Sequence, residues 1–211
     1  GLIEIGIKKG DKVGMYMLNC AEFVFSILGT HKTGGVQVPI NKDEKGERLA
    51  YVINYSEMQA LVIDMSGLPL IEEIADKLTD LKVIYIASNS TEIPNEIGKI
   101  KVQSFSNLYN SSNKNPNIEI TIKDQERCMF TSGTTGMPKG VVREHGGVVM
   151  TVRSYLQYQG IRSEDVLMSV LSLGHANAQA MCLFTSIGAG ATAVFFPKFS
   201  ASNFFKWAND C

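Results

Sequence analysis

The amino-acid sequence predicts an α/β fold built on a mostly parallel sheet with helices on its faces. Strand-like and helix-like segments alternate along the chain, which is typical of parallel strands joined by helical crossovers. The chain has 211 residues, enough for one α/β domain or two small ones. Apolar residues make up 45% and charged residues 19% of the chain, which excludes disorder as the dominant state.

The amino-terminal half alternates between apolar strands and amphipathic helices. Asn19 and Glu22 have the spacing of a capping box, so a helix should begin there, and Gly34-Gly35 should end it. The apolar run 36–40 contains a proline, which indicates an edge strand or a strand end. The other expected strands are 12–18, 59–65 and 81–87, and the other expected helices are 47–55 and 69–78.

The polar stretch 110–117 is the expected boundary between two portions of one large domain. The first is an α/β portion, 1–110, and the second, 111–211, is truncated at its carboxyl side. The second portion should contain strands 127–131, 140–144, 166–171 and 191–196, and helices 148–158, 176–187 and 200–210.

Charge and cysteine content exclude several classes of protein. Twenty Lys and Arg against 21 Asp and Glu argue against a protein that coats nucleic acid or an anionic membrane. Residues 166–197 lack Asp, Glu, Lys and Arg and are long enough to span a bilayer, but their Ser, Gly, Asn and Gln favour buried strands and a helix. The cysteines are too far apart for a zinc ribbon and predict reduced thiols in a cytoplasmic protein: Cys20, Cys128, Cys182 and Cys211.

One segment combines the residue types that bind phosphate. Residues 130–140 read Phe-Thr-Ser-Gly-Thr-Thr-Gly-Met-Pro-Lys-Gly and follow an expected strand. Glycines let backbone N–H groups turn towards an anion, hydroxyls add donors, and Lys139 adds a compact positive charge. It is not a Walker loop, because Pro138 and Gly140 stand where that motif has Gly and Ser or Thr. We predict phosphate binding, with a polar surface turn or linker as the alternative.

The same eleven residues resemble the signature loop of the adenylate-forming superfamily, which includes acyl-CoA synthetases, firefly-type luciferases and the adenylation domains of peptide synthetases. Segments 8–22 and 32–41 resemble the superfamily motifs GD-x-V…N-x-x-E and K-x-G-x-x-x-x-P-[IL]-[ND]. Leu-Gly-His at 173–175 resembles a segment that usually reads P-x-x-H, here without the proline. Residues 175–179 and 197–201 look most like crotonobetaine/carnitine–CoA ligases.

The resemblance implies part of the large N-terminal domain of an AMP-forming acid–thiol ligase. Such an enzyme converts a carboxylic acid and ATP into an acyl-adenylate, with Mg²⁺, and transfers the acyl group to CoA. His175 would border the carboxylate and the acyl pocket. The residues that would hold the β- and γ-phosphates are Thr131, Ser132, Gly133, Thr134, Thr135, Gly136 and Lys139.

Two alternatives stay open: a peptide-synthetase-type adenylation domain that serves a carrier protein, and a non-catalytic nucleotide-binding module. The intact loop favours an enzyme. The superfamily's adenine and ribose motifs and its carboxyl-terminal lysine do not occur in 1–211, so we expect a catalytically incomplete fragment.

His145 could be a polar residue at a strand end or act directly. His31 suits a helix carboxyl end, and no chemistry is assigned to it.

Overall fold

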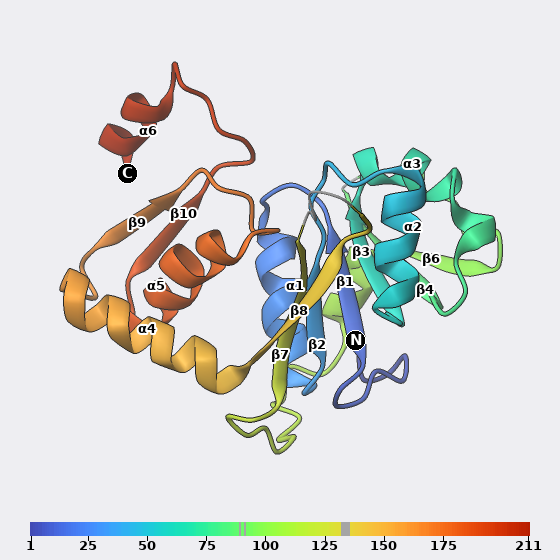
Figure 1. Cartoon of the computed structure of the whole chain (residues 1–211), viewed down its shortest axis with the longest axis horizontal. Helices are drawn as coiled ribbons and strands as arrows, with labels where there is room; N and C mark the ends of the chain where they lie inside the picture. The colour runs from blue at the N-terminus through green and yellow to red at the C-terminus, as the bar shows by residue number, and fades with distance from the viewer. Residues whose placement is uncertain (89, 91, 132–135) are drawn as a thin grey trace.

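The computed structural model describes residues 1–88, 90, 92–131 and 136–211 (Figure 1). Within them the strands are β1 (Lys12–Tyr16), β2 (Val36–Pro39), β3 (Ala60–Asp64), β4 (Val83–Ala87), β5 (Glu96–Ile97), β6 (Ile100–Ser104), β7 (Gln125–Thr131), β8 (Lys139–Glu144), β9 (Val166–Ser169) and β10 (Thr192–Phe195). The helices are α1 (Ala21–Lys32), α2 (Gly46–Tyr55), α3 (Leu68–Glu72), α4 (His145–Gln159), α5 (Thr185–Ala189) and α6 (Phe204–Asp210). A π-helix spans Ala178–Phe184, and 3₁₀ turns span Met65–Gly67, Ala75–Lys77 and Phe105–Asn110.

An eight-stranded sheet organises the chain, with the strand order β5-β6-β4-β3-β1-β2-β7-β8. The six strands between the edges are parallel to their neighbours, whereas the edge strands β5 and β8 pair antiparallel. The predicted α/β class with a mostly parallel sheet is therefore confirmed.

Both faces of the central strands of this sheet are buried under helices, as parallel strands require, whereas the edge strand β8 is mostly exposed. Along β3, Leu61 and Ile63 pack in the cluster that contains residues of α2 and α3. Ala60 and Val62 alternate with them and pack in the cluster that contains residues of α1. Figure 1 shows α1 on one side of the sheet and α2 on the other.

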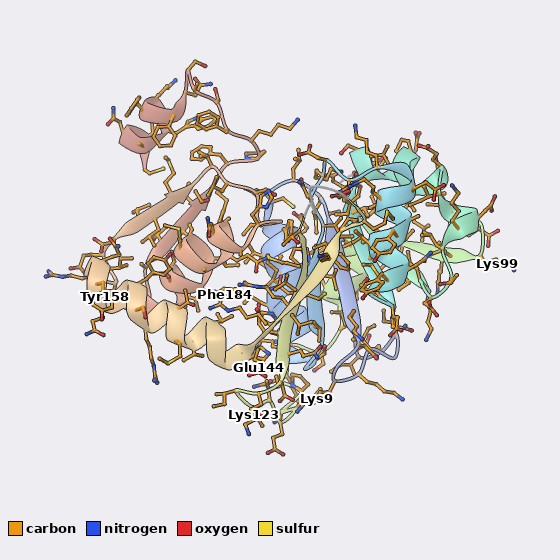
Figure 2. All side chains as sticks on the ribbon, viewed as in Figure 1. Lys9, Lys99, Lys123, Glu144, Tyr158 and Phe184 are labelled. Carbon is orange, nitrogen blue, oxygen red and sulfur yellow. The ribbon has the colours of Figure 1, made fainter. Side chains whose placement is uncertain are left out.

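A second, two-stranded sheet follows in the chain. β9 and β10 pair in parallel, and the π-helix and α5 connect them. Leu183 and Phe184 of the π-helix share a core cluster with Phe23 and Ile27 of α1. Phe184, labelled in Figure 2, lies where this second unit meets the α1 face of the large sheet.

The apolar run 36–40 forms β2, which lies between β1 and β7 and ends at Pro39, so the strand-end alternative is confirmed and the edge strand is not. Two further elements differ from the expectations. Helix 69–78 is interrupted at Ile74, whose φ of −111° leaves α3 and the 3₁₀ turn Ala75–Lys77 as separate pieces. Strand β6 was not predicted, although Lys and Gln alternate with its apolar residues in the period-two pattern of a half-buried strand.

The uncharged segment 166–197 forms β9, the π-helix, α5 and β10, in line with the interpretation as strand, helix and strand. Over the described ranges, the structure contains no helix with the length and apolar character that crossing a membrane requires. Here too the helical part differs from the expectation: residues 178–184 are wound as a π-helix before the α-helical turn of α5 begins.

Candidate functional site

The predicted phosphate loop connects β7 to β8. Thr131, the last residue of β7, pairs across the antiparallel strands with Lys139, the first residue of β8. The Thr131 hydroxyl lies 3.5 Å from the carbonyl oxygen of Lys139. Both residues and Gly136 are exposed and open to a ligand. Outside the described residues lie the remaining predicted loop residues, Ser132, Gly133, Thr134 and Thr135.

His175 lies at the same edge of the sheet as this loop. It is exposed, in a turn that packs against the end of β2: a Cβ added to Gly174 would lie 3.3 Å from the carbonyl oxygen of Ile40. Because β2 and β7 are parallel neighbours, their carboxyl ends share one edge. This is the edge at which open α/β sheets bind ligands.

Asn19 fixes the turn that precedes His175. Its side-chain amide donates to the carbonyl oxygens of Leu171 at 2.8 Å and Phe196 at 2.9 Å. Its side-chain oxygen accepts from the backbone N–H of Leu173 at 2.7 Å. The predicted capping box is therefore wrong: Cys20 is the N-cap of α1, without a side-chain cap bond, and Asn19 serves a distant turn instead.

His145 is far from the phosphate loop. β8 runs antiparallel to β7, so it carries the chain from Lys139 to the opposite edge of the sheet, about 20 Å away along an extended strand. There the backbone N–H of His145 donates to the carbonyl oxygen of Asp124 at 3.0 Å. Burial and the neighbouring His31 lower the pKa of His145. This placement favours the interpretation as a polar residue at a strand end.

Sequence reasoning missed a buried polar cluster between the two sheets. Gln37 and Gln179 are 0% exposed, Glu126 is 1% and Arg127 is 3% exposed. His31, to which no chemistry was assigned, lies 3.2 Å from the Glu126 carboxylate. The only sequence signal was a Glu-Arg pair at the start of an otherwise apolar strand.

A β-bulge in β7 turns both members of that pair into the cluster. Gln125 pairs with Glu144 and Arg127 pairs with Arg143, so Glu126 is the extra residue on its strand. A bulge places two neighbouring side chains where regular alternation would place one, and bulges often lie next to functional sites. Both Glu126 and Arg127 consequently reach Gln37 or Gln179 from adjacent positions.

The Glu126 carboxylate is charged in this setting. Burial acts to raise its pKa, but the hydrogen bond from His31, the charge of Arg127 and the bond from Gln37 outweigh burial and lower the pKa below its ordinary value. Arg127 Nε lies 3.5 Å from Glu126 Oε2, so the buried charges compensate each other.

Two pockets lie away from the carboxyl edge. One, of about 620 Å³, includes His31, His145 and Ile118. The other, of about 540 Å³, is lined by Phe25, Phe105 and other residues of the α1 face. No group of three or more His, Cys, Asp or Glu in the described part of the chain is arranged to hold a metal ion.

A comparison with known protein families identifies the family of this chain. The profile of a family described as AMP-binding enzyme matches residues 1–211. The chain belongs to the AMP-binding enzyme family. This AMP-binding enzyme chain is 32% identical over 204 residues to the crotonobetaine/carnitine–CoA ligase of Salmonella enteritidis PT4 (strain P125109). It is 30% identical over 202 residues to the ligase of the same name from Proteus mirabilis (strain HI4320).

The alignments cover 95% of the AMP-binding enzyme chain but only 38% and 39% of these two relatives. Among solved structures, the anthranilate CoA ligase AuaEII in complex with anthranoyl-AMP matches 98% of the chain with a TM-score of 0.83 and 26% identity, over 39% of its own length. The N-terminal domain of FACL13 from Mycobacterium tuberculosis matches 97% with a TM-score of 0.80 and 26% identity, over 48% of its length. The fold is thus that of the N-terminal part of an adenylate-forming enzyme.

Proposed function

We propose that this chain is part of an AMP-forming acyl-CoA synthetase, an acid–thiol ligase that uses ATP and CoA. The observation that supports it most is the shared carboxyl edge, at which β7 ends and the His175 turn packs on the end of β2. The names of the relatives agree, since crotonobetaine/carnitine–CoA ligases are acid–thiol ligases. One structural neighbour was solved with an acyl-adenylate, the intermediate that this reaction would form.

The proposed reaction has two steps. A carboxylate oxygen attacks the α-phosphorus of ATP, so that an acyl-adenylate forms and pyrophosphate leaves with the electrons of the broken P–O bond. The CoA thiolate then attacks the acyl carbon, forms the thioester and releases AMP. Both steps depend on stabilising charge on phosphoryl and acyl oxygens, and neither needs a nucleophile from the protein.

The roles of the chain follow from this chemistry. Lys139 would pair its ammonium with the β- or γ-phosphate, and His175 would donate to the carboxylate as it approaches the α-phosphorus. The other proposed phosphate ligands are Thr131, Ser132, Gly133, Thr134, Thr135 and Gly136. Mg²⁺, when bound with ATP, neutralises phosphate charge.

We infer the cytoplasm as the compartment of this enzyme. All four cysteines are free thiols, which suits a reducing environment. Burial raises the pKa of Cys182 to about 11 and that of Cys20 to about 11, so neither is an activated thiolate.

The test is carboxylate-dependent exchange of radiolabelled pyrophosphate into ATP, measured on the full-length protein. Fatty, aromatic, amino and betaine-type acids are screened separately, with a reaction lacking acid as the control. Exchange that requires one acid class is the expected result. A folded protein that binds ATP but exchanges with no acid would instead be a non-catalytic nucleotide-binding module.

A second assay separates the two possible thiol acceptors. The acid that supports exchange is incubated with ATP and either CoA or a phosphopantetheine-loaded carrier protein. An acyl-CoA product agrees with the proposal. Transfer to the carrier alone would assign the chain to a peptide-synthetase-type adenylation domain.

A further inference from the structure

The buried cluster links the two segments that form the proposed site. Arg127 belongs to β7, about 13 Å along the strand before the phosphate loop begins after Thr131. Gln179 belongs to the π-helix that follows His175 in the chain. Gln37, on β2, lies directly beside Arg127 in the sheet and contacts Gln179.

Gln179 uses every hydrogen-bonding position of its side chain. Its Nε2 donates to the Gln37 Oε1 at 3.1 Å and to the carbonyl oxygen of Leu173 at 2.8 Å. Its Oε1 accepts from Gln37 Nε2 at 3.0 Å and from Arg127 Nη1 at 3.1 Å. A fully satisfied, buried amide has one allowed orientation, so these four hydrogen bonds hold Gln179 and its three partners in a fixed arrangement.

The Leu173 end of this arrangement is close to His175, whereas the Arg127 end joins it to the strand that leads to the phosphate loop. The Leu173 carbonyl lies two residues before His175, in the turn that also contains the closely packed Gly174. At the other end, Gln37 Nε2 donates to Glu126 Oε1 at 2.5 Å, which ties the bulge of β7 into the same network. π-helical turns are rare and frequently occur at functional sites, which is where Gln179 is found.

We propose that Gln179 is a positioning residue for adenylation, which sets the place of His175 relative to the phosphate loop through Leu173 on one side and Arg127 on the other. The inference rests on the proposed function of this edge of the sheet. If Gln179 only filled this volume, an apolar side chain would serve equally well, because a buried cluster of charged and polar groups gives little net stability over apolar side chains. Attack on phosphorus instead requires reacting groups placed within a fraction of an ångström.

The decisive experiment is a double-mutant cycle in the full-length protein, read by carboxylate-dependent ATP–pyrophosphate exchange. The variants are Gln179→Met, which keeps the volume but removes the amide, His175→Ala and the two combined. We expect Gln179→Met to lower the exchange rate at saturating ATP and acid on the order of ten- to a hundredfold, because a misplacement of about 1 Å has effects of that size. In the His175→Ala background the same change should lower the rate less than about twofold.

Matched controls separate positioning from stability. Gln157→Met changes the same residue type on the exposed side of α4 and should leave exchange unchanged in both backgrounds. Should Gln179→Met fail to fold, Arg127→Lys replaces it in the cycle, because lysine keeps the charge opposite Glu126 but loses the guanidinium bond to Gln179. The loss with Arg127→Lys should also disappear in the His175→Ala background.

Each of the other outcomes overturns the inference or the proposed function. An equal loss in both backgrounds means that Gln179 acts on the fold as a whole, and it overturns the inference. A folded Gln179→Met variant with wild-type exchange overturns it as well. If the wild-type protein exchanges with no acid, the proposed function itself fails. If His175→Ala leaves exchange unchanged, the role of His175 fails and takes the inference with it.

Discussion

The side-chain oxygen of Asn19 accepts a hydrogen bond from the backbone N–H of Leu173 at 2.7 Å, although 154 positions separate the two residues. The contact joins the turn after β1 to the turn before His175. It is buried, so water cannot replace the bond if the side chain is lost. A residue of the turn between β1 and α1 thus helps to shape the turn that carries His175.

Asn19→Ala should destabilise the protein by about 2 kcal/mol or more. The change leaves the Leu173 N–H and the carbonyls of Leu171 and Phe196 without their partner, and an unsatisfied buried group costs about 1–3 kcal/mol. Urea unfolding measures the loss. Asn209→Ala on the exposed face of α6 is the control and should stay within about 0.5 kcal/mol of the wild type.

Lys139→Ala should weaken adenylation while leaving stability within about 0.5 kcal/mol, because the residue is exposed at the start of β8. Removing one charge-assisted phosphate contact should cost roughly 1.5–3 kcal/mol, which is about ten- to a hundredfold in exchange rate over KM for ATP. The matched control is Lys99→Ala in the exposed β5–β6 turn, labelled in Figure 2. Unchanged pyrophosphate exchange with Lys139→Ala would reject the assignment of this residue.

Gly174→Ala should displace the His175 turn. Its new methyl group would lie 3.1 Å from the Ser172 hydroxyl oxygen and 3.3 Å from the Ile40 carbonyl oxygen, which is tighter than ordinary van der Waals contact. Overpacking of this kind costs about 1–3 kcal/mol. Calorimetry should show a lower unfolding temperature, and exchange should slow.

Gly29→Ala, the control for Gly174→Ala, should stabilise the protein, whereas Gly174→Ala should destabilise it. Gly29 lies within α1, and apart from its chain neighbours and the backbone of its own helix no described atom comes within 4 Å of a Cβ placed there. Replacing glycine inside a helix should stabilise the protein by roughly 0.5–1 kcal/mol. Equal effects of the two substitutions would contradict the close packing of the His175 turn on β2.

Asp124→Asn should destabilise the protein above pH 4, with an effect that shrinks as the pH falls towards 2. The hydrogen bond from the Lys9 side chain, at 2.8 Å, and the bond from the Thr121 N–H lower the pKa of Asp124 from 3.8 to about 2. Folding therefore favours the charged form, so its contribution is complete above pH 3.8 and is lost as the pH falls through 2. Urea midpoints from pH 6 to pH 2 should converge for the two proteins, whereas a constant offset would argue against the ion pair as the cause. Asp210→Asn in α6 is the control.

Local patterns predicted most strands, because an apolar run between turn signals describes a buried parallel strand well. β4 and the helix α2 follow their patterns closely, with Leu49, Val52 and Ile53 buried as expected. The place of β2 between β1 and β7 was out of reach, because strand order depends on pairing between distant segments. The phosphate loop stays a prediction from composition, which was possible because all of its groups lie within eleven residues.

The side chains that hold the candidate site in place could not be predicted from local patterns. Asn19 matched a local capping pattern, yet its partners are more than 150 positions away. Gln37, Glu126 and Gln179 are far apart in the sequence, and only the fold brings their side chains together. The β-bulge in β7 was a further obstacle to prediction. A single extra residue changes which side chains share a face of the strand, and the hydrophobic pattern of the sequence does not reveal it.

The internal position of β2 also has a consequence for synthesis on the ribosome. β1 and its two neighbours, β2 and β3, are made early in translation and can pair soon afterwards. The other neighbour of β2 is β7, which is translated only after β3, β4 and β6. Until then, the nascent chain displays β2 as an open edge, with the unpaired backbone groups that invite association between chains. A ribosomal pause before residue 125 would prolong this exposure.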